Sequence, residues 1–268
     1  MYKIDYHIHT TLSPDGKASV EDQINAAIEA GLSEIAITDH CECNNNESIP
    51  PEFEPWFDFN PDTYIKTISK AEKAGIKVRT GIELGQATQN KEYADKILSY
   101  HEWDVVLGSL HNLKNTYDFY YLGLQNVDIR PLMKEYFNQL YELVCYNHFD
   151  VLAHLYYPIK YMFNASQELD IFEYTYQIVV IFKRLIENGK ALEINTSALL
   201  SPYKNAVPQR EFIKIYRDLG GELITIGSDS HTTGTVGLGV GDVIQMLKDL
   251  GFKAVTTYEK HKPIFIDI

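Results

Sequence analysis

Short apolar runs alternate with longer helix-like segments along almost the whole chain. The apolar runs are YKIDYHIH (2–9), EIAITDH (34–40), VRTGIEL (78–84), DVVLGSLH (104–111), DVLAHL (150–155), ALEINTS (191–197) and ELITIGSDSH (222–231). Helix-like segments separate or follow them near residues 19–30, 62–75, 90–100, 129–147, 168–188, 208–219 and 240–250. Strands that alternate with helices predict a parallel sheet whose connections are right-handed crossovers.

The ends of the helix-like segments carry the expected signals. Ser19 with Asp22, and Asp62, are candidate N-terminal caps, because their side-chain oxygens can accept hydrogen bonds from free backbone N–H groups. Glycine in a left-handed conformation often ends a helix. Several segments are followed by such a residue, namely Gly31, Gly75, Gly189, Gly220 and Gly251.

Composition limits the class of protein. The chain has 268 residues, 45% of them hydrophobic, which is enough for one large core, and no linker or repeat divides it. We therefore expect one domain over residues 1–268. No apolar run has the length of a membrane span and no secretory leader is recognisable, so we expect a cytoplasmic protein without a membrane partner.

Charge and cysteine content narrow the class further. A net charge of −13 repels phosphate backbones and disfavours nucleic acid as a partner, although bound metal ions would reverse the field locally. The three cysteines, Cys41, Cys43 and Cys145, are too few for a disulfide framework and fit a reducing compartment. Cys41 and Cys43 have no second cysteine pair, so a structural zinc site is the less favoured interpretation.

Polar residues at the strand ends decide between a closed barrel and an open sheet. In a barrel all strand ends converge on one face, whereas an open sheet would spread them too widely to meet. Nearly every run ends in residues capable of chemistry, namely His7 and His9, His40, Glu83, His111, His154, Asp229 and His231. We therefore expect an α/β, TIM-like barrel, with a candidate eighth strand near 254–257.

The spacing of the histidines indicates metal binding. His7 and His9 are two apart on one predicted strand, so both imidazoles point to the same side and can hold one ion. Asp229 and His231 share this spacing if their strand persists. For a single histidine such as His111, the alternative is an ordinary hydrogen-bonded residue. Histidine and carboxylate ligands together suit zinc, manganese or iron.

Two acidic residues have competing interpretations. Glu83 closes a buried strand, where an unpaired carboxylate is unfavourable, so it either bridges two metal ions or forms a salt bridge with Arg79 or a lysine. Asp39 either orients the neighbouring His40 or is a polar turn residue that caps the next segment. The remaining histidines lie away from the strand ends and are expected to be structural: His101, His148 and His261.

The motifs as a set resemble those of the polymerase-and-histidinol-phosphatase (PHP) family. The matching segments occur in the order of that family and cover nearly the whole chain: YHIHT (6–10), ITDH (37–40), GIEL (81–84), GSLH (108–111), LAHL (152–155) and GSDSH (227–231). The resemblance implies a distorted barrel of seven β/α units, in agreement with the alternation of strands and helices.

The resemblance also implies two or three divalent metal ions as cofactors, either zinc, manganese or iron. Glu83 would bridge the first two ions. Some family members have histidine in place of Asp15, and the alternative for this residue is a turn aspartate before Gly16. The implied ligand sets are His7, His9, Glu83 and Asp229 for one ion, Glu83, His111 and His154 for a second, and Asp15, His40 and His231 for a third.

Within the PHP family, the chain resembles stand-alone bacterial histidinol-phosphatases in length, acidic character and the long segment after ITDH. This implies hydrolysis of L-histidinol phosphate to L-histidinol and phosphate, a step of histidine biosynthesis. The ions would activate water for direct attack on phosphorus. The leaving group would take its proton from a bound water, His231 or Asp39. No serine or cysteine nucleophile motif favours a covalent intermediate.

Three features are candidates for binding a small phosphate monoester. Segment 41–62 carries Trp56 among other aromatic residues and carboxylates, which suit an ammonium and an imidazole; the alternative is a surface loop. Lys160 is a candidate phosphate clamp at a position where similar enzymes often carry arginine, or else a lysine facing solvent. Ser197 is a weaker candidate for a hydrogen bond to phosphate.

Other functions share parts of this pattern. A PHP enzyme acting on nucleotides, sugar phosphates or polynucleotides would use the same ligands, although a polynucleotide needs a basic groove. A metallo-amidohydrolase also uses a histidine pair on its first strand, but no lysine lies at a strand end. The complete ligand set disfavours a non-catalytic metal-binding module. The sequence does not define the oligomeric state.

Overall fold

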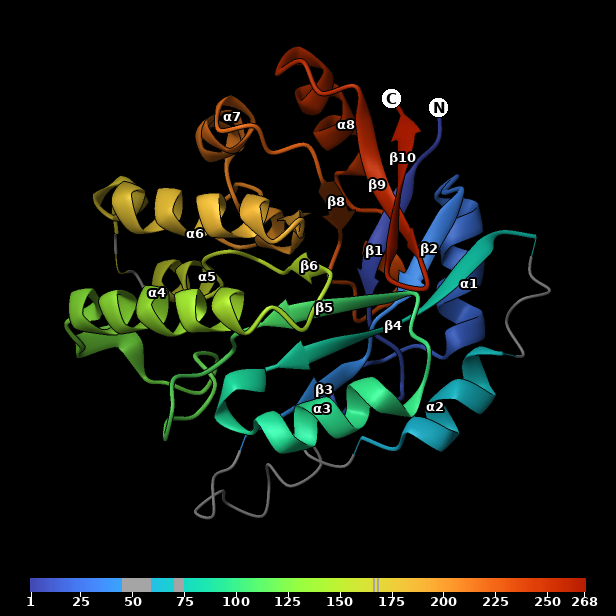
Figure 1. Ribbon diagram of the computed structural model, residues 1–268, viewed down its shortest axis with the longest axis horizontal. Coiled ribbons are helices and arrows are strands. Elements are labelled where there is room, and N and C mark those ends of the chain that lie inside the picture. Colours follow the sequence, from blue (N-terminus) through green and yellow to red (C-terminus); the bar gives the residue numbers. More distant parts are fainter. Residues whose placement is uncertain (45–58, 70–74, 166, 168) are drawn as a thin grey trace.

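The computed structural model describes residues 1–44, 59–69, 75–165, 167 and 169–268. Its central sheet is parallel throughout, in the order β1-β2-β4-β5-β6-β7-β8. These strands form a nearly closed barrel with the helices outside it (Figure 1). Their bounds are β1 Ile4–Ile8, β2 Glu34–Ile37, β4 Lys77–Gly85, β5 Val105–Ser109, β6 Val151–Leu152, β7 Ala191–Asn195 and β8 Ile224–Gly227.

The barrel closes between β1 and β8 at their carboxyl ends. The backbone N–H of His9 donates to the carbonyl of Ser230 at 2.9 Å, and that of Asp229 donates to the carbonyl of His7 at 2.8 Å. Deeper in the barrel, the buried carboxylate of Asp5 accepts from the N–H of Ser228 at 2.8 Å. The predicted barrel of seven β/α units is therefore confirmed, and its closure brings the first and last candidate ligands together.

Seven helices match the predicted segments, and their apolar sides pack against the barrel. A further short helix, α5 Ile159–Asn164, was not predicted. Within the described residues, no helix is both long and apolar enough to cross a bilayer. The seven are α1 Val20–Glu29, α2 Pro61–Ile68, α3 Lys91–Tyr100, α4 Ile129–Tyr146, α6 Thr175–Glu187, α7 Arg210–Asp218 and α8 Val240–Asp249.

The predicted helix ends are mostly correct. Ser19 and Asp22 form a capping box at α1. Asp62 is not a cap, because it follows Pro61 inside α2; the cap is Asn60, whose side chain accepts from the N–H of Thr63 at 3.0 Å. The predicted helix 62–75 ends earlier, because α2 ends at Ile68 with Ser69 as its C-cap, so Gly75 does not end this helix. The other stop glycines have positive φ, between 65° and 92°: Gly31, Gly189, Gly220 and Gly251.

Two strand elements differ from the prediction. Strand β3, His40–Glu42, pairs with the second half of β4, because β4 extends well beyond the end of β2. The candidate eighth strand forms as β9, Ala254–Glu259, but it does not join the barrel. A turn at Lys260 folds the chain back, so β9 pairs in antiparallel fashion with β10, Lys262–Asp267.

Six of the seven predicted runs extend past the strands that form, and only the run that contains Glu83 does not. His9 lies one residue past β1 and His111 two residues past β5. Strand β6 ends at Leu152 and β8 at Gly227, so neither His154 nor Asp229 lies on a strand. Both residues have positive φ, 21° for His154 and 55° for Asp229, which is unusual for residues other than glycine. Strained backbone of this kind is concentrated at functional sites. The side chains reach the barrel end through these turns and not through an extended strand.

Candidate metal centre and active site

All the metal ligands predicted from the sequence lie at the carboxyl end of the barrel. Nitrogen and oxygen atoms of all but Asp15 form overlapping groups in which every member lies within 4.8 Å of the others. In the described part of the chain, no such group includes a cysteine. The groups are His7, Glu83 and His154; His7, His9 and Asp229; His40, Glu83 and His111; and His9, His40 and His231.

Glu83 lies at the centre of these groups and is fully buried. Its Oε1 is 2.7 Å from Nε2 of His154 and 2.9 Å from Nε2 of His111. Its Oε2 is 3.3 Å from Nε2 of His7 and 3.5 Å from Nε2 of His9. Oε2 is also 2.9 Å from Nδ1 of His40. The two carboxylate oxygens therefore face different sets of histidines, which is the arrangement expected of a bridging ligand.

The alternative salt bridge of Glu83 to Arg79 does not form. Nε of Arg79 donates to Oε1 of Glu34 at 2.6 Å, and its Nη1 donates to Glu259 at 3.0 Å. Burial raises the pKa of Glu83, but the surrounding histidines, led by His111, hold it well below its usual value. Glu83 is therefore an ionised carboxylate among imidazoles.

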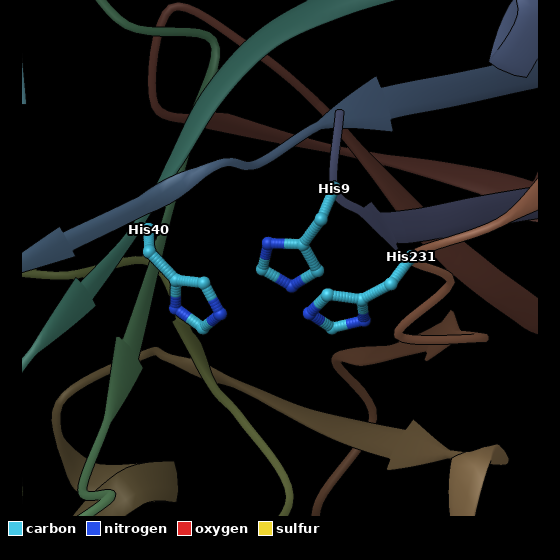
Figure 2. A group of neighbouring side chains, drawn as sticks. All are labelled: His9, His40 and His231. Atoms are coloured by element: carbon cyan, nitrogen blue, oxygen red, sulfur yellow. The ribbon is translucent and has the colours of Figure 1, made fainter. Parts of the chain in front are cut away.

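A third group of histidines lies beside Glu83. The ring of His9 stacks between those of His40 and His231, with centroid distances of 4.2 Å and 4.1 Å. The three rings come from different strand ends and gather around one space (Figure 2). Asp15 joins them, with Oδ2 at 2.9 Å from Nε2 of His231 and Oδ1 at 3.8 Å from Nε2 of His40. Asp15 is a turn residue, but its carboxylate faces the site.

Several buried ligand atoms have no hydrogen-bond partner. Such atoms are rare in folded proteins, because an unpaired buried polar group is unfavourable. Here they face one another across a shared space, and a divalent cation would satisfy them. Imidazole nitrogens and carboxylate oxygens are a donor set for zinc, manganese or iron. These atoms are Nε2 of His7 and His9, Oδ1 of Asp15 and Oε2 of Glu83.

Two further glutamates contact histidines that are candidate metal ligands. Nδ1 of His7 is 2.7 Å from Oε1 of Glu193, and Nδ1 of His111 is 3.0 Å from Oε1 of Glu42. A carboxylate only accepts, so each Nδ1 carries the proton and leaves Nε2 free for a metal. Glu193 also accepts from the backbone N–H of His154 at 2.7 Å.

Both orienting glutamates were missed in the sequence. The signal was present, because Glu193 stands within the buried strand ALEIN and Glu42 follows His40 by two residues. A carboxylate on a buried strand needs a partner, and this reason, which singled out Glu83, holds equally for both residues.

Asp39 does not line the cavity, and its carboxylate is hydrogen-bonded to the loop after β1. Its carboxylate accepts from the N–H of Thr10 at 2.6 Å and from the hydroxyl of Ser13 at 2.7 Å. Oγ of Ser13 in turn accepts from the N–H of His40 at 2.9 Å and lies 3.3 Å from Nδ1 of His9. Asp39 therefore contacts His9 and His40 only indirectly, through the hydroxyl of Ser13.

A cavity of about 410 Å³ opens onto the ligands. Lys160 lies in it, with Nζ 3.6 Å from Oδ2 of Asp229 and 3.5 Å from Oγ of Ser197, so these two predicted phosphate contacts come together. Trp56 lies outside the described residues, as does most of segment 41–62. The cavity is lined by Asp15, Lys17, His40, His111, Asp118, Tyr120, Tyr121, Tyr157, Lys160, Tyr161, Asp229 and His231.

The remaining histidines lie elsewhere. Nδ1 of His148 is 3.0 Å from Asp95, Nδ1 of His261 is 2.8 Å from Asp150, and the ring of His101 packs edge-on against Trp103. A larger hollow of about 620 Å³ lies near Gly221, before β8, and contains no predicted site residue. The smaller cavity is therefore the candidate active site, because the histidines and carboxylates that could bind metal ions lie there and not at the larger hollow.

Comparison with known proteins decides the family. Residues 5–197 match the model of the PHP domain. The chain belongs to the PHP domain family. The matched region ends before Asp229 and His231, and the structure brings these two residues to the same centre as the ligands inside it.

Sequence similarity to known proteins extends beyond the PHP domain and covers nearly the whole chain. A probable histidinol-phosphatase of Thermotoga maritima is 30% identical over 255 residues, covering 93% of each chain. One of Clostridium acetobutylicum is 32% identical over 94% of this chain and 95% of its own. The crystal structure of histidinol phosphate phosphatase from Lactococcus lactis, complexed with zinc, L-histidinol and phosphate, has a TM-score of 0.83 at 23% identity over 98% of both chains. That structure has the same fold.

Proposed function

We propose that this chain is a metal-dependent histidinol-phosphatase, which hydrolyses L-histidinol phosphate to L-histidinol and phosphate in histidine biosynthesis. The observation that carries the proposal is the position of Glu83, whose two carboxylate oxygens face two different sets of histidines. Full-length similarity to probable histidinol-phosphatases supports this substrate among phosphate monoesters.

The ligand atoms fit two or three divalent ions. Glu83 would hold two of them side by side, and Asp15 with His40 and His231 would hold a third. When bound, the ions would supply the Lewis acidity that activates water and neutralises charge on the phosphoryl group. The protein's part is to keep the donor atoms rigid, which Glu193 and Glu42 do through His7 and His111.

Lys160 and Ser197 would bind the phosphate. Nζ of Lys160 is held next to the ligand Asp229, and Oγ of Ser197 lies 3.2 Å from the same carboxylate. A phosphate group bound beside Asp229 would thus contact the positive charge of Lys160 and the hydroxyl of Ser197. A lysine supplies charge without the two-pronged geometry of arginine.

Tyr157 would shield the reacting group from bulk water. Its side chain is 9% exposed, and its ring packs on His111 and His154 with centroid distances of 4.8 Å and 4.9 Å. Electrostatic interactions strengthen where water is excluded. Tyr157 therefore contributes to the site without donating a ligand.

Of the two side chains expected as proton donors, His231 is the better placed. It lines the cavity, and its Nδ1 is 3.0 Å from the carbonyl of Asp229. Asp39 is fully buried against Thr10 and Ser13 and lies too deep to reach a leaving group in the cavity. We infer that Asp39 positions the loop. Since His231 would hold an ion through Nε2 while its Nδ1 faces the carbonyl of Asp229, the leaving group would take its proton from a bound water on the His231 side and not from the imidazole.

The test is a substrate panel combined with metal analysis. Purified protein would be stripped with a chelator, reloaded with zinc or manganese, and assayed on histidinol phosphate, O-phosphoethanolamine, a sugar phosphate, a nucleotide and single-stranded DNA. We expect activity only after reloading, with kcat/KM at least about tenfold higher for histidinol phosphate. A tenfold preference for another substrate would refute the substrate assignment. Loss of all monoesterase activity under both metals would refute the reaction class.

A further inference from the structure

The ammonium of Lys160, the proposed phosphate contact, has two long polar contacts. Its Nζ lies 3.6 Å from Oδ2 of Asp229 and 3.5 Å from Oγ of Ser197. Asp229 is also a candidate metal ligand, so a bound ion would share its negative charge. A lysine carries its charge on a flexible four-carbon stem. These two contacts alone would hold the ammonium loosely.

Two tyrosine rings also lie against this ammonium. Nζ of Lys160 is 4.9 Å from the ring centre of Tyr157 and 5.2 Å from that of Tyr161. A cation within about 6 Å of an aromatic face is attracted by the partial negative charge of that face. The attraction is stronger where water is largely excluded, and the side chain of Lys160 is only 20% exposed. The rings therefore add a second set of contacts to the ammonium.

Hydrogen bonds restrict the rotation of both rings. The ring centroids are 5.0 Å apart and the planes meet at 68°. The hydroxyl of Tyr161 donates to that of Tyr157 at 2.9 Å, and Tyr157 donates to Oδ1 of Asp118 at 3.1 Å. Asp118 also accepts from the backbone N–H of Tyr120 at 2.7 Å. This chain of hydrogen bonds fixes the two ring faces that Lys160 contacts.

Of the two rings, that of Tyr161 is the better one to test. Tyr157 packs on His111 and His154, so its replacement would disturb candidate metal ligands as well as Lys160. The described ring contacts of Tyr161 are instead with Tyr157 and Tyr120. An effect on the ammonium can therefore be separated at Tyr161 from an effect on the metal centre.

We propose that Tyr161 is a positioning residue, whose ring, together with that of Tyr157, holds the ammonium of Lys160 where it contacts the phosphate. The inference rests on the part of the proposed function that assigns the phosphate to Lys160. It is independent of the organic part of the substrate. It gives a role to a cavity residue that the proposed mechanism does not use.

A double-mutant cycle tests this role. The dissociation constant of inorganic phosphate would be measured by calorimetry for the zinc-loaded wild type, Tyr161→Leu, Lys160→Met and the double variant. We expect Tyr161→Leu to weaken phosphate binding about 3- to 10-fold, because one ring face is lost. In the Lys160→Met background the same replacement should change the constant by less than about twofold, because no ammonium is left to hold. An equal loss in both backgrounds would mean a purely structural role and overturns the proposal.

Two further variants separate the ring face from the bulk of the side chain. Tyr161→Phe should keep the phosphate affinity within about twofold of the wild type, since the face remains. A trifluorinated phenylalanine at position 161 has nearly the same shape, but its fluorines withdraw electrons from the face. It should weaken phosphate binding about as much as leucine does, and it makes the test even if Tyr161→Leu does not fold. Equal affinity in the plain and fluorinated phenylalanine variants overturns the proposal.

The outcomes are distinguishable from failure of the proposed function. Phosphate binding needs no turnover, so a preference of the wild type for another monoester refutes the substrate assignment and leaves the cycle decisive for Tyr161. Zinc content would be measured in every variant, and loss of zinc in Tyr161→Leu would place the effect at the metal ligands and overturn the proposal. The matched control is Tyr176→Leu on α6, which replaces a tyrosine that is 78% exposed and does not line the cavity.

Discussion

Oε1 of Glu83 lies 2.7 Å from Nε2 of His154, although the two residues are 71 positions apart in the chain. Glu83 lies near the end of β4 and His154 just after β6, with β5 between them. Parallel strands bring their carboxyl ends to one face, so residues distant in sequence become neighbours there. The other oxygen of Glu83 faces His7, His9 and His40. Loss of this shared carboxylate should therefore affect more than one ion.

Glu83→Gln should abolish turnover. An amide of the same shape cannot give both oxygens to two ions, so we expect at least one bound zinc per chain to be lost and kcat to fall by about 10³ or more. Zinc content and turnover of histidinol phosphate would be measured together. Glu92→Gln, an exposed residue on α3, is the control. Full activity in Glu83→Gln would exclude this residue as an essential ligand.

Glu193→Gln should weaken the site without removing a ligand. Glu193 holds Nδ1 of His7 and the N–H of His154, and a carboxamide can keep only part of that pairing. Loss of such an orienting group typically costs about 10- to 100-fold in metal affinity or activity. Zinc affinity would be measured by competition with a chelating dye. The control is Glu187→Gln on α6, whose side chain is 63% exposed, and an equal affinity in both variants would contradict the role.

Lys160→Met should weaken phosphate binding. Removing a charged hydrogen-bond donor is expected to raise KM and the inhibition constant of inorganic phosphate by about 10-fold or more. Lys160→Arg should keep most of the affinity because it keeps the charge. Steady-state kinetics with phosphate as product inhibitor provides the measurement, with the exposed Lys183→Met as control. Unaltered phosphate inhibition in Lys160→Met would rule out the clamp.

His261 should make stability depend on pH. Its hydrogen bond to Asp150 raises the pKa of His261 above its usual value of 6.5. Because the folded state binds this proton more tightly, the stabilisation is fully present below the unfolded pKa and is lost as pH rises through the folded pKa.

The variant His261→Gln tests this pH dependence. We expect it to lower the free energy of unfolding more at about pH 5.5 than at about pH 9. The imidazole is 42% exposed, so the difference should stay below about 1 kcal/mol. Urea denaturation of both proteins at the two pH values, under the same metal conditions, gives the comparison. A difference that does not change with pH would argue against the pairing.

Most of the ligand set was predictable because each ligand ends its own apolar run. His7, His9, His40, Glu83 and His111 could be selected from local patterns alone, since a polar residue that closes a buried strand is conspicuous. Their partners were harder to find. Glu193 and Asp118 become part of the site only through contacts across strands or between loops, and no local spacing relates them to His7 or Tyr157.

Local patterns determined the alternation of strands and helices, the helix ends and the chemical character of the strand ends. Each of these depends on residues within a few positions of one another, where propensity and periodicity act directly. Only the tertiary structure decided which oxygen of Glu83 faces which histidine and where the barrel closes. It also decided that β9 stays outside the barrel and that Lys160 lies next to Ser197 in the cavity. These features depend on packing between segments far apart in the chain, which no periodicity within one segment encodes.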